Sequence, residues 1–175
     1  MSPEKQEILF ARYPGIFRDR TKPMTESCMH WGIEVGDGWF DLLNALCEAI
    51  NKPYSGSVRA VEDGSDEGFE YEFPQVVADQ VKEKYGTLRF YSHLDLGPEW
   101  DDRRARFPKT VATLMARFSA YVDGAIGMAE ALSARTCEST GELAEMHVKD
   151  GWYATMSRAE GVKRGFVPVS ELKKP

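Results

Sequence analysis

The longest apolar repeat in the chain is the feature that most constrains its fold. Pro108 suits the first turn of a helix, and the apolar residues after it recur at the spacing of one helix face: Val111, Leu114, Met115, Phe118, Val122, Ala125, Ile126 and Ala129. A helix from Pro108 to about Ala134 would be roughly 40 Å long. It would be either the spine of the domain or half of a homodimer seam. Gly124 and Gly127 each cost about 1 kcal/mol relative to alanine, which predicts that they serve close packing.

Residues 28–46 predict a short strand, a tight turn and a second helix. Gly36-Asp37-Gly38 is a turn signal, and Asp37 is the expected N-cap of the helix that follows it. Before the turn, apolar residues alternate with polar or small ones, as in a half-buried strand: Met29, Trp31, Ile33 and Val35. After the turn, apolar residues recur along one face of a helix: Trp39, Leu42, Leu43, Leu46, Cys47 and Ile50.

Two interpretations of this stretch stay open. Two tryptophans that flank a turn bury a large apolar area, which favours a nucleus of the core. The alternative is a binding pocket that uses polar side chains of the same stretch: His30, Glu34, Asp37 and Asp41. Trp31, Trp39 and Asp37 are therefore candidate binding residues. A catalytic group of Cys28, His30 and Asp37 is a less favoured alternative.

Other segments of the first half carry shorter patterns. Ser2-Pro3 predicts the start of a helix that ends at Pro14-Gly15. Residues 52–68 are rich in glycine and acidic residues, which predicts a solvated loop with a short strand at 58–61. Phe69, Tyr71 and Phe73 alternate with glutamates as in a strand. Residues 74–86 predict a helix and Thr87 to Ser92 a strand, so that strand, helix and strand would form a crossover unit.

From Arg135 the pattern changes to that of a small module. Residues 136–141 predict a knuckle, and Asp150-Gly151 predicts the type I′ turn of a hairpin that spans 143–156. Ser157 and Glu160 occupy the two positions of a capping box, and Gly165 ends the helix that this box begins. Knuckle, hairpin and helix in this order resemble a treble-clef zinc finger.

The chain resembles a family of uncharacterised proteins from tailed phages and prophages. The segments that carry the resemblance are PEKQEILFARYPGIF, CMHWGIEVGDGWFDLLNALC, PQVVADQVKEKYGTLRFYS and MAEALSARTCE, in this order. The resemblance implies a C-terminal module with four zinc ligands, two at the knuckle and two at the last helix. Cys137 stands at the first of these positions, but Thr140, Ser157 and Glu160 stand at the others. Hydroxyl groups do not replace thiolates as structural zinc ligands, so we predict a module without metal or cofactor.

Charge and cysteine content narrow the functional classes. The net charge of −6 and the pI of about 5.2 argue against a broad nucleic-acid surface. A local contact is still open, because Arg103, Arg104, Arg106 and Lys109 form the basic cluster of the chain. The three cysteines are far apart, which favours a reducing cytoplasm. No apolar run reaches the length of a membrane span, and the first ten residues lack the pattern of a signal peptide.

These patterns together predict an α+β fold. A long helix and two or three shorter helices should pack against a small sheet in residues 1–134. Residues 135–175 should form a treble-clef-like β-hairpin and helix packed on that core. We expect a phage or prophage accessory protein that binds a host or phage protein, with inhibition of a host defence as one role. The alternatives are nucleic-acid binding through the C-terminal module and the arginine cluster, and a small hydrolase; no enzymatic activity is expected.

Overall fold

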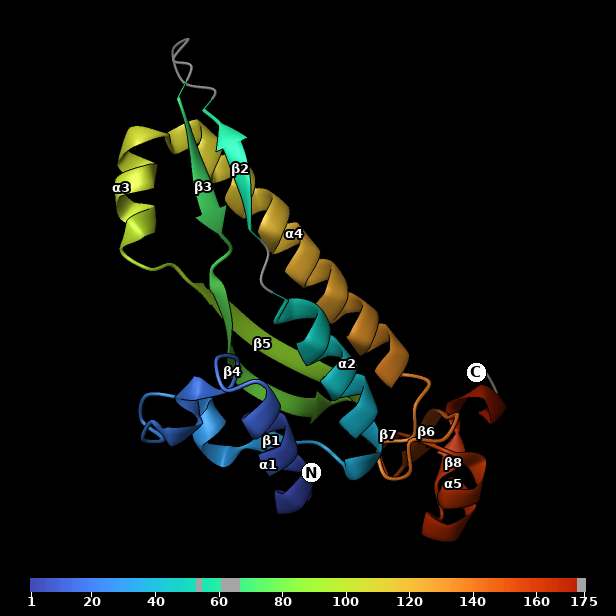
Figure 1. Cartoon of the computed structure of the whole chain (residues 1–175). Coiled ribbons are helices and arrows are strands. Elements are labelled where there is room, and N and C mark those ends of the chain that lie inside the picture. The colour runs from blue at the N-terminus through green and yellow to red at the C-terminus, as the bar shows by residue number, and fades with distance from the viewer. Residues whose placement is uncertain (53–54, 61–66, 173–175) are drawn as a thin grey trace.

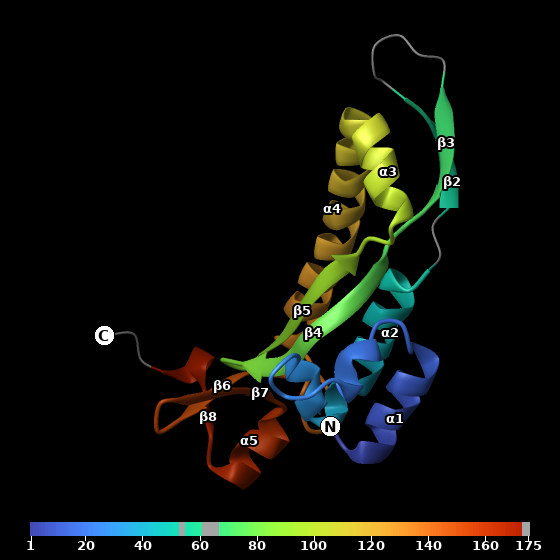
Figure 2. The same cartoon turned by 90° about the vertical axis from the view of Figure 1, so that its left-hand side faces the viewer.

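The spine of the molecule is the helix α4 (Pro108–Ser133). The computed structural model describes residues 1–52, 55–60 and 67–172. At the N-terminal end of α4 lie α3 (Glu99–Arg106) and a hairpin of β2 (Ser55–Arg59) and β3 (Gly68–Glu72). The C-terminal module lies at the opposite end of α4 (Figures 1 and 2). The expected α+β class and the long helix are both confirmed.

A three-stranded sheet in the middle of the molecule carries the main core. Its strand order is β1-β4-β5, with β1 (Ile33–Glu34) parallel to β4 (Gln75–Lys84) and β5 (Thr87–Asp95) antiparallel to β4. Besides α4, the helices α1 (Pro3–Arg12) and α2 (Phe40–Ile50) contribute to this core. The side chains that meet there include Leu9, Trp39, Leu43, Val81, Leu88, Phe118 and Val122. The expected apolar faces of α2 and α4 are confirmed by this packing.

The strand expected at residues 29–35 is largely wrong. A 3-10 helix, η2 (Cys28–Trp31), occupies its first half, and the Ser27 hydroxyl caps it by accepting the Met29 N–H at 3.1 Å. Gly32 follows η2 as its C-cap residue, with φ 73°, a conformation that glycine adopts without strain. Only Ile33 and Glu34 pair as a strand. Trp31 consequently points outward, whereas the prediction placed it on the face of Met29 and Ile33.

Asp37 does not cap α2 either. A short 3-10 helix, η3 (Asp37–Trp39), precedes α2, and the Asp37 Oδ1 accepts the backbone N–H of Ser2 at 2.6 Å. This hydrogen bond is the main reason why the pKa of Asp37 lies below its usual value. Asp37 therefore joins the start of α1 to the turn, in place of the expected cap.

The helix expected at 74–86 is a strand, so the expected crossover unit is also wrong. Residues 75–84 form β4, which turns into β5 through Tyr85 and Gly86, both with positive φ, as in a type I′ hairpin. The helix prediction rested on Val77, Val81 and Tyr85, and a spacing of four residues fits one face of a strand as well as one face of a helix. The ladder also shifts its register between Ala78 and Gln80. This shift lets Val76, Ala78 and Val81 all face the main core although their spacing changes from two to three. A spacing of this kind resembles one face of a helix.

The hairpin of β2 and β3 has a small core of its own. Trp100, Val111 and Leu114 are buried there, and Val58, Phe69 and Tyr71 pack against them from the hairpin. The expected strand at 69–73 is confirmed. The sequence pattern of residues 93–107 predicts a polar loop anchored by Trp100; Trp100 is buried, but the loop is wrong in part, because β5 continues to Asp95 and Glu99–Arg106 form α3. The strand expected at 58–61 begins earlier, at Ser55, and Val61 lies outside the described residues, as do Glu62, Asp63 and Asp66. We call β2, β3 and α3 together the arm.

The C-terminal module follows its sequence pattern closely. β6 (Glu145–Lys149) and β7 (Trp152–Met156) form the expected hairpin, with Asp150 and Gly151 at positive φ. Ser157 caps α5 (Arg158–Arg164) by accepting the Glu160 N–H, and Gly165 ends it in the left-handed conformation. β8 (Val167–Pro168) then pairs with β6 and gives the order β7-β6-β8.

Backbone contacts join the Gly36–Gly38 turn to the knuckle of this module. The Gly38 N–H donates to the carbonyl of Glu138 at 2.8 Å, and the Trp39 indole N–H donates to the carbonyl of Thr136 at 2.7 Å. A Cβ added at Gly38 would lie 2.2 Å from the carbonyl oxygen of Cys137, so glycine is required there. The Gly36 N–H donates to the Glu138 carboxylate at 2.8 Å. Burial nevertheless raises the pKa of Glu138.

Gly124 and Gly127 do not serve close packing within the chain. A Cβ added at either position would meet no atom within 4 Å. Together with three exposed alanines, these two glycines form the outward face of α4: Ala116, Ala120 and Ala131. The expected homodimer through α4 concerns two chains and stays a prediction.

Replacing either helical glycine by alanine should stabilise the protein. Gly124→Ala and Gly127→Ala each remove backbone freedom from the unfolded chain and gain helix propensity, worth about 0.5–1 kcal/mol. In a chain of this size, thermal unfolding should then rise by about 2–4 °C per kcal/mol. Gly38→Ala is the control and should destabilise strongly, because its new Cβ would overlap the knuckle. A loss of stability in Gly124→Ala would show that this face is covered in solution.

The stability conferred by Glu138 should depend on pH. The pKa of Glu138 is raised in the folded state, so its protonation contributes favourably to the free energy of unfolding at low pH. This contribution is lost as the pH rises through the folded-state pKa. Glu138→Gln keeps an oxygen that can accept the Gly36 N–H but carries no charge. The melting temperature of this variant relative to wild type should therefore increase from pH 4.5 to pH 8 (about the range in which a carboxylate with a raised pKa titrates).

Glu48→Gln is the matched control for this experiment. It makes the same change in net charge at an exposed position of α2. Its melting temperature relative to wild type should stay nearly constant over the same pH range. If Glu138→Gln behaved in the same way as this control, burial of the Glu138 carboxylate would have no effect on stability.

Candidate functional site

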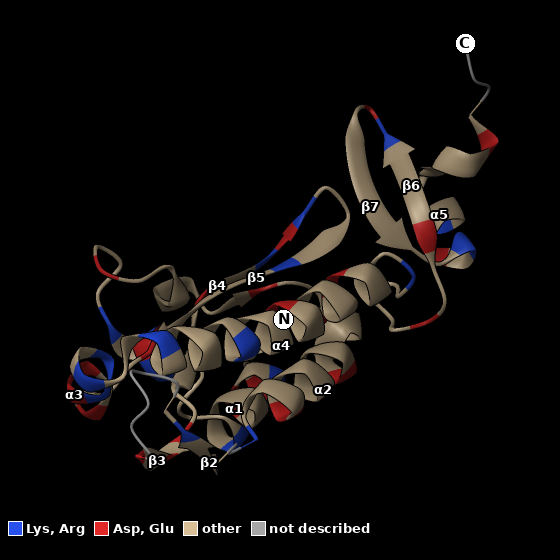
Figure 3. Cartoon of the chain, turned by 90° about the horizontal axis from the view of Figure 1, so that it is seen from above, with Lys and Arg blue, Asp and Glu red and all other residues tan. Residues whose placement is uncertain are grey.

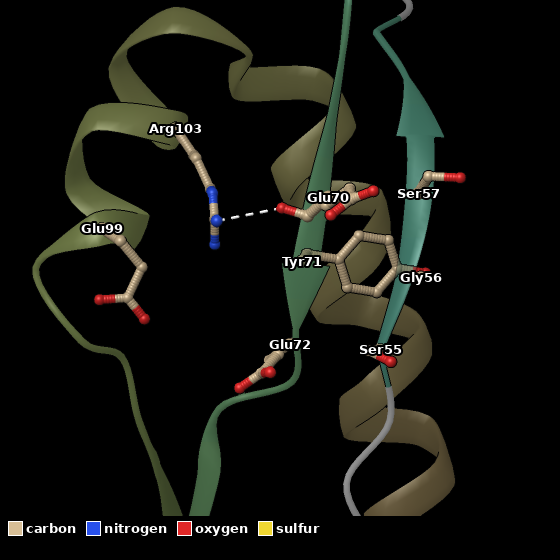
Figure 4. A pocket seen from close by; sticks show the side chains of 8 residues that line it. All are labelled: Ser55, Gly56, Ser57, Glu70, Tyr71, Glu72, Glu99 and Arg103. Atoms are coloured by element: carbon tan, nitrogen blue, oxygen red, sulfur yellow. Dashed lines mark hydrogen bonds between the residues drawn. The ribbon is translucent and has the colours of Figure 1, made fainter.

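An open cleft lies between the hairpin and α3. Its volume is about 710 Å³, and the residues that line it come from all three elements of the arm: Ser55, Gly56, Ser57, Glu70, Tyr71, Glu72, Glu99 and Arg103. Figure 4 shows β3 between α3 on one side and β2 on the other. Of the residues singled out by sequence, only Arg103 lines this cleft.

Strand alternation decides which side chains the hairpin presents. In β3, Phe69 and Tyr71 are half-buried toward α3 and α4, whereas Glu70 and Glu72 are exposed on the other face. The partner strand β2 alternates in the same way, so Ser57 lies opposite Glu70 and Ser55 opposite Glu72. The outer face of the hairpin therefore combines two carboxylates with two short hydroxyl side chains, and Arg59 follows Ser57 on the same face opposite Gly68.

Arg103 closes one edge of the hairpin. Its Nη2 donates to the backbone carbonyl of Glu70 at 3.0 Å (Figure 4). Its guanidinium also lies over the rings of Trp100 and Phe69, at 5.0 Å and 5.4 Å from their centroids. These contacts hold Arg103 in place and leave its charge close to the carboxylates of the cleft.

The three glutamates of the cleft are not neutralised by ion pairs. Within the described parts of the chain, no lysine or arginine forms a salt bridge with Glu70, Glu72 or Glu99. Carboxylates that are open to solvent and unpaired attract cationic groups. The cleft is therefore suited to bind lysine or arginine side chains, with hydroxyl groups of the serines as additional hydrogen-bond partners.

The arginine cluster does not present a basic surface. Arg106 pairs with Glu67 at 2.5 Å, and Arg103 donates to the carbonyl of Glu70. Among the described residues, Arg104 and Lys109 are the members of the cluster that are exposed and form no salt bridge. The first turn of α3 carries three acids, Glu99, Asp101 and Asp102. Acidic and basic segments consequently adjoin each other along this helix (Figure 3). A phosphate backbone would meet both charges there.

The candidates of the central stretch do not form one site. Trp39 is fully buried, so it cannot contact a partner and serves the core instead. Trp31 is 60% exposed and stacks edge-on with His30. The His30 Nδ1 lies 3.1 Å from the carbonyl of Lys22, whereas Asp37 accepts the Ser2 N–H. No hydrogen bond joins Cys28, His30 and Asp37 among the described residues, so the geometry offers no nucleophile and base at this place.

At the four positions to which the resemblance assigns zinc ligands, hydrogen bonds surround Cys137. Burial acts to raise the pKa of the Cys137 thiol, but hydrogen bonds from the Thr140 hydroxyl and from the N–H groups of Ser157, Thr140 and Ser139 outweigh it and lower the pKa. Glu160 contributes its backbone N–H to the cap of α5. The described residues contain no group of three or more histidine, cysteine or acidic side chains placed to hold a metal ion.

Sequence reasoning missed most residues of the cleft. The alternation of Glu70 and Glu72 with aromatic residues indicated a face of carboxylates, and this signal could have identified two of them. Glu99 could not be found in this way, because its proximity to β3 depends on how α3 packs on the hairpin. The pairing of Ser55 and Ser57 with the glutamates depends equally on the register of β2.

A zinc chelator should leave the melting temperature of the protein unchanged. The hydrogen bonds around Cys137 take the place of metal bonds, and Thr140 and Ser157 supply no thiolate. A structural zinc ion contributes about 10 kcal/mol or more to folding, so its removal would lower thermal stability by far more than experimental error. Thermal unfolding with and without EDTA measures this, and a large decrease would contradict the prediction.

Comparisons with known proteins add no identification. No family model, no curated protein and no solved structure matches this chain. Within the described residues, no helix combines the length and the apolar character needed to cross a membrane.

Proposed function

We propose that this protein acts by binding another protein, and that the arm is its contact surface. The observation that carries the proposal is the open cleft of the arm, in which three glutamates outnumber the one described cation, Arg103, and form no salt bridge with a described lysine or arginine. A two-stranded hairpin is marginally stable by itself. Here Trp100, Val111 and Leu114 form a separate apolar cluster that holds it in place. A chain that builds such a support for an exposed polar hairpin uses that hairpin for contact.

Charge favours a protein partner over a nucleic acid. Among the described residues of the hairpin, 55–60 and 67–72, three are acidic, Glu67, Glu70 and Glu72, and Arg59 is the single basic one. A surface of this sign repels phosphates and attracts basic protein surfaces. Binding of nucleic acid through the C-terminal module and the cluster Arg103, Arg104 and Arg106 is the second candidate. It is less well supported, because two of these arginines are engaged within the arm.

The chemistry of the cleft favours binding over catalysis. The residues that line it include glutamates and serines but neither histidine nor cysteine. A serine there has no imidazole beside it to take its proton, so the arrangement does not match a Ser–His hydrolase.

The resemblance to phage and prophage proteins suggests the cellular setting. On that basis the protein is an accessory protein of the bacterial cytoplasm, and its partner is a basic host or phage protein. Inhibition of a host process, including a host defence, is the role that this setting favours. The exposed Trp31 is a further contact candidate.

Reversing the charge of the hairpin should abolish partner binding. In an affinity purification from host lysate treated with nuclease, the wild-type protein should retain one basic protein. Glu70→Lys combined with Glu72→Lys should reduce its recovery by about tenfold or more, as expected when close charge pairs are replaced by like charges. Mass spectrometry of the retained proteins measures this.

A matched control makes the same change in net charge elsewhere. Glu7→Lys combined with Glu48→Lys alters two exposed positions of α1 and α2 and should retain the partner. Equal loss in both variants would show that only net charge matters and would contradict a role of the arm. Loss of all retained proteins on nuclease treatment would favour the nucleic-acid alternative.

A further inference from the structure

We infer that the outer edge of β2 binds an extended basic segment of the partner as an added antiparallel strand. This inference rests on the proposed function, because it specifies how the arm would hold its partner. The ligand class is a peptide segment with lysine or arginine at alternate positions.

The hydrogen-bond pattern of the hairpin identifies the backbone groups that point outward. In an antiparallel pair, residues opposite each other alternate between bonded and non-bonded pairs. The Ala60 N–H donates to the Glu67 carbonyl at 2.7 Å, so Ala60 and Glu67 are a bonded pair. Counting along the register, Ser57 opposite Glu70 and Ser55 opposite Glu72 are non-bonded pairs. The N–H and C=O groups of both serines therefore point away from β3.

One edge of the hairpin is covered, and the other is open. On the β3 side, Arg103 donates to the outward carbonyl of Glu70, which agrees with the pattern just derived. On the β2 side, no described residue donates to or accepts from the outward backbone groups of Ser55 and Ser57. Figure 1 draws α4 next to β2, but Figure 2 shows that α3 and α4 both lie to one side of the hairpin, so α4 lies behind the strand in Figure 1. An open edge of this kind is a template for another strand.

The side chains around this edge select a basic ligand. Neighbouring strands are about 4.8 Å apart, so an added strand would lie about 10 Å from β3. Ser55 and Ser57 are short and leave the space above β2 open. Lysine or arginine side chains opposite these serines can therefore extend across β2 to Glu72 and Glu70 on the same face. Basic residues two positions apart fit this arrangement, since they share one face of a strand.

The same charges disfavour a second copy of this chain as the occupant. Pairing β2 with β2 of another copy would bring Glu70 and Glu72 of both copies onto one four-stranded sheet. Of the five residues of β2, only Arg59 is basic, so a second copy would bring fewer cations to these glutamates than a segment with a basic residue at every other position. The acidic hairpin is thus suited to a partner of opposite charge.

A labelled synthetic peptide tests the inference directly. The probe is a capped hexapeptide of alternating lysine and threonine, and fluorescence anisotropy at low salt measures its binding to the full chain. In the antiparallel register, the lysines opposite Ser55 and Ser57 direct their own N–H groups toward β2. N-methylation of the lysine amides should therefore weaken binding by about tenfold or more, the loss expected for two or three hydrogen bonds.

The matched peptide carries the same number of methyl groups on the threonine amides. Those amides point away from β2, so its affinity should stay within about twofold of the unmethylated peptide, a difference of less than about 0.5 kcal/mol. Equal affinities of the two methylated peptides would overturn the inference, because the contact would then depend on charge alone. Absence of binding by the unmethylated peptide would overturn it as well.

Variants of the edge provide an independent measurement. Ser57→Pro removes the outward N–H without removing a hydrogen bond to β3, so it should weaken binding of the peptide by about tenfold. The control, Ser57→Thr, keeps that N–H and should bind the peptide as wild type does. Melting temperatures show whether both variants fold. A partner from lysate that is lost on reversal of Glu70 and Glu72 but retained by Ser57→Pro would overturn strand addition and leave the proposed function intact. A partner retained by both variants would overturn both.

Discussion

The contact between the Gly36–Trp39 turn and the knuckle after α4 is the constraint on which the rest of the structure depends. It combines two backbone-directed hydrogen bonds, from Gly38 to Glu138 and from Trp39 to Thr136, with an approach so close that a Cβ at Gly38 would overlap Cys137. Because Trp39 is also fully buried in the main core, this contact fixes the C-terminal module to the same residues that position α2. Polar backbone groups that are buried must be paired, and here each segment satisfies groups of the other.

The position of the arm follows from the same arrangement. α4 begins beside the hairpin and ends at the knuckle, so the arm lies at one end of this helix and the C-terminal module at the other (Figure 1). Val111 and Leu114 at its start bury the inner face of the hairpin, while Phe118 and Val122 belong to the main core. The rigid helix therefore holds the acidic hairpin away from the main core. In this position the open edge of β2 and the carboxylates of β3 are accessible.

Sequence patterns predicted α1, α2, α4, α5 and the C-terminal hairpin well, because their signals are local, but they missed α3. The caps, the helical spacing of α4 and the Asp150-Gly151 turn each depend on residues close in the chain. They failed where tertiary structure overrides local spacing. The spacing of Val77 and Val81 in β4 fits a helix as well as a strand, and the register shift between Ala78 and Gln80 interrupts the alternation of this strand. Likewise, η2 replaces a strand that would have buried Trp31. Of the candidate site residues, Arg103 lies at the cleft, Trp39 is core, and Asp37 joins α1 to the turn.

The sequence by itself determined the α+β class, the long helix, the cap and hairpin of the C-terminal module, and the acidic character of residues 55–72. Each of these follows from side chains that act through their own or neighbouring backbone, or from composition. Only the tertiary structure decided that Glu99 and Arg103 lie beside Glu70 and Glu72, that Arg103 covers one edge of the hairpin, and that the edge at Ser55 and Ser57 is open. These relations depend on strand register and on how α3 packs, which are contacts between segments far apart in the chain.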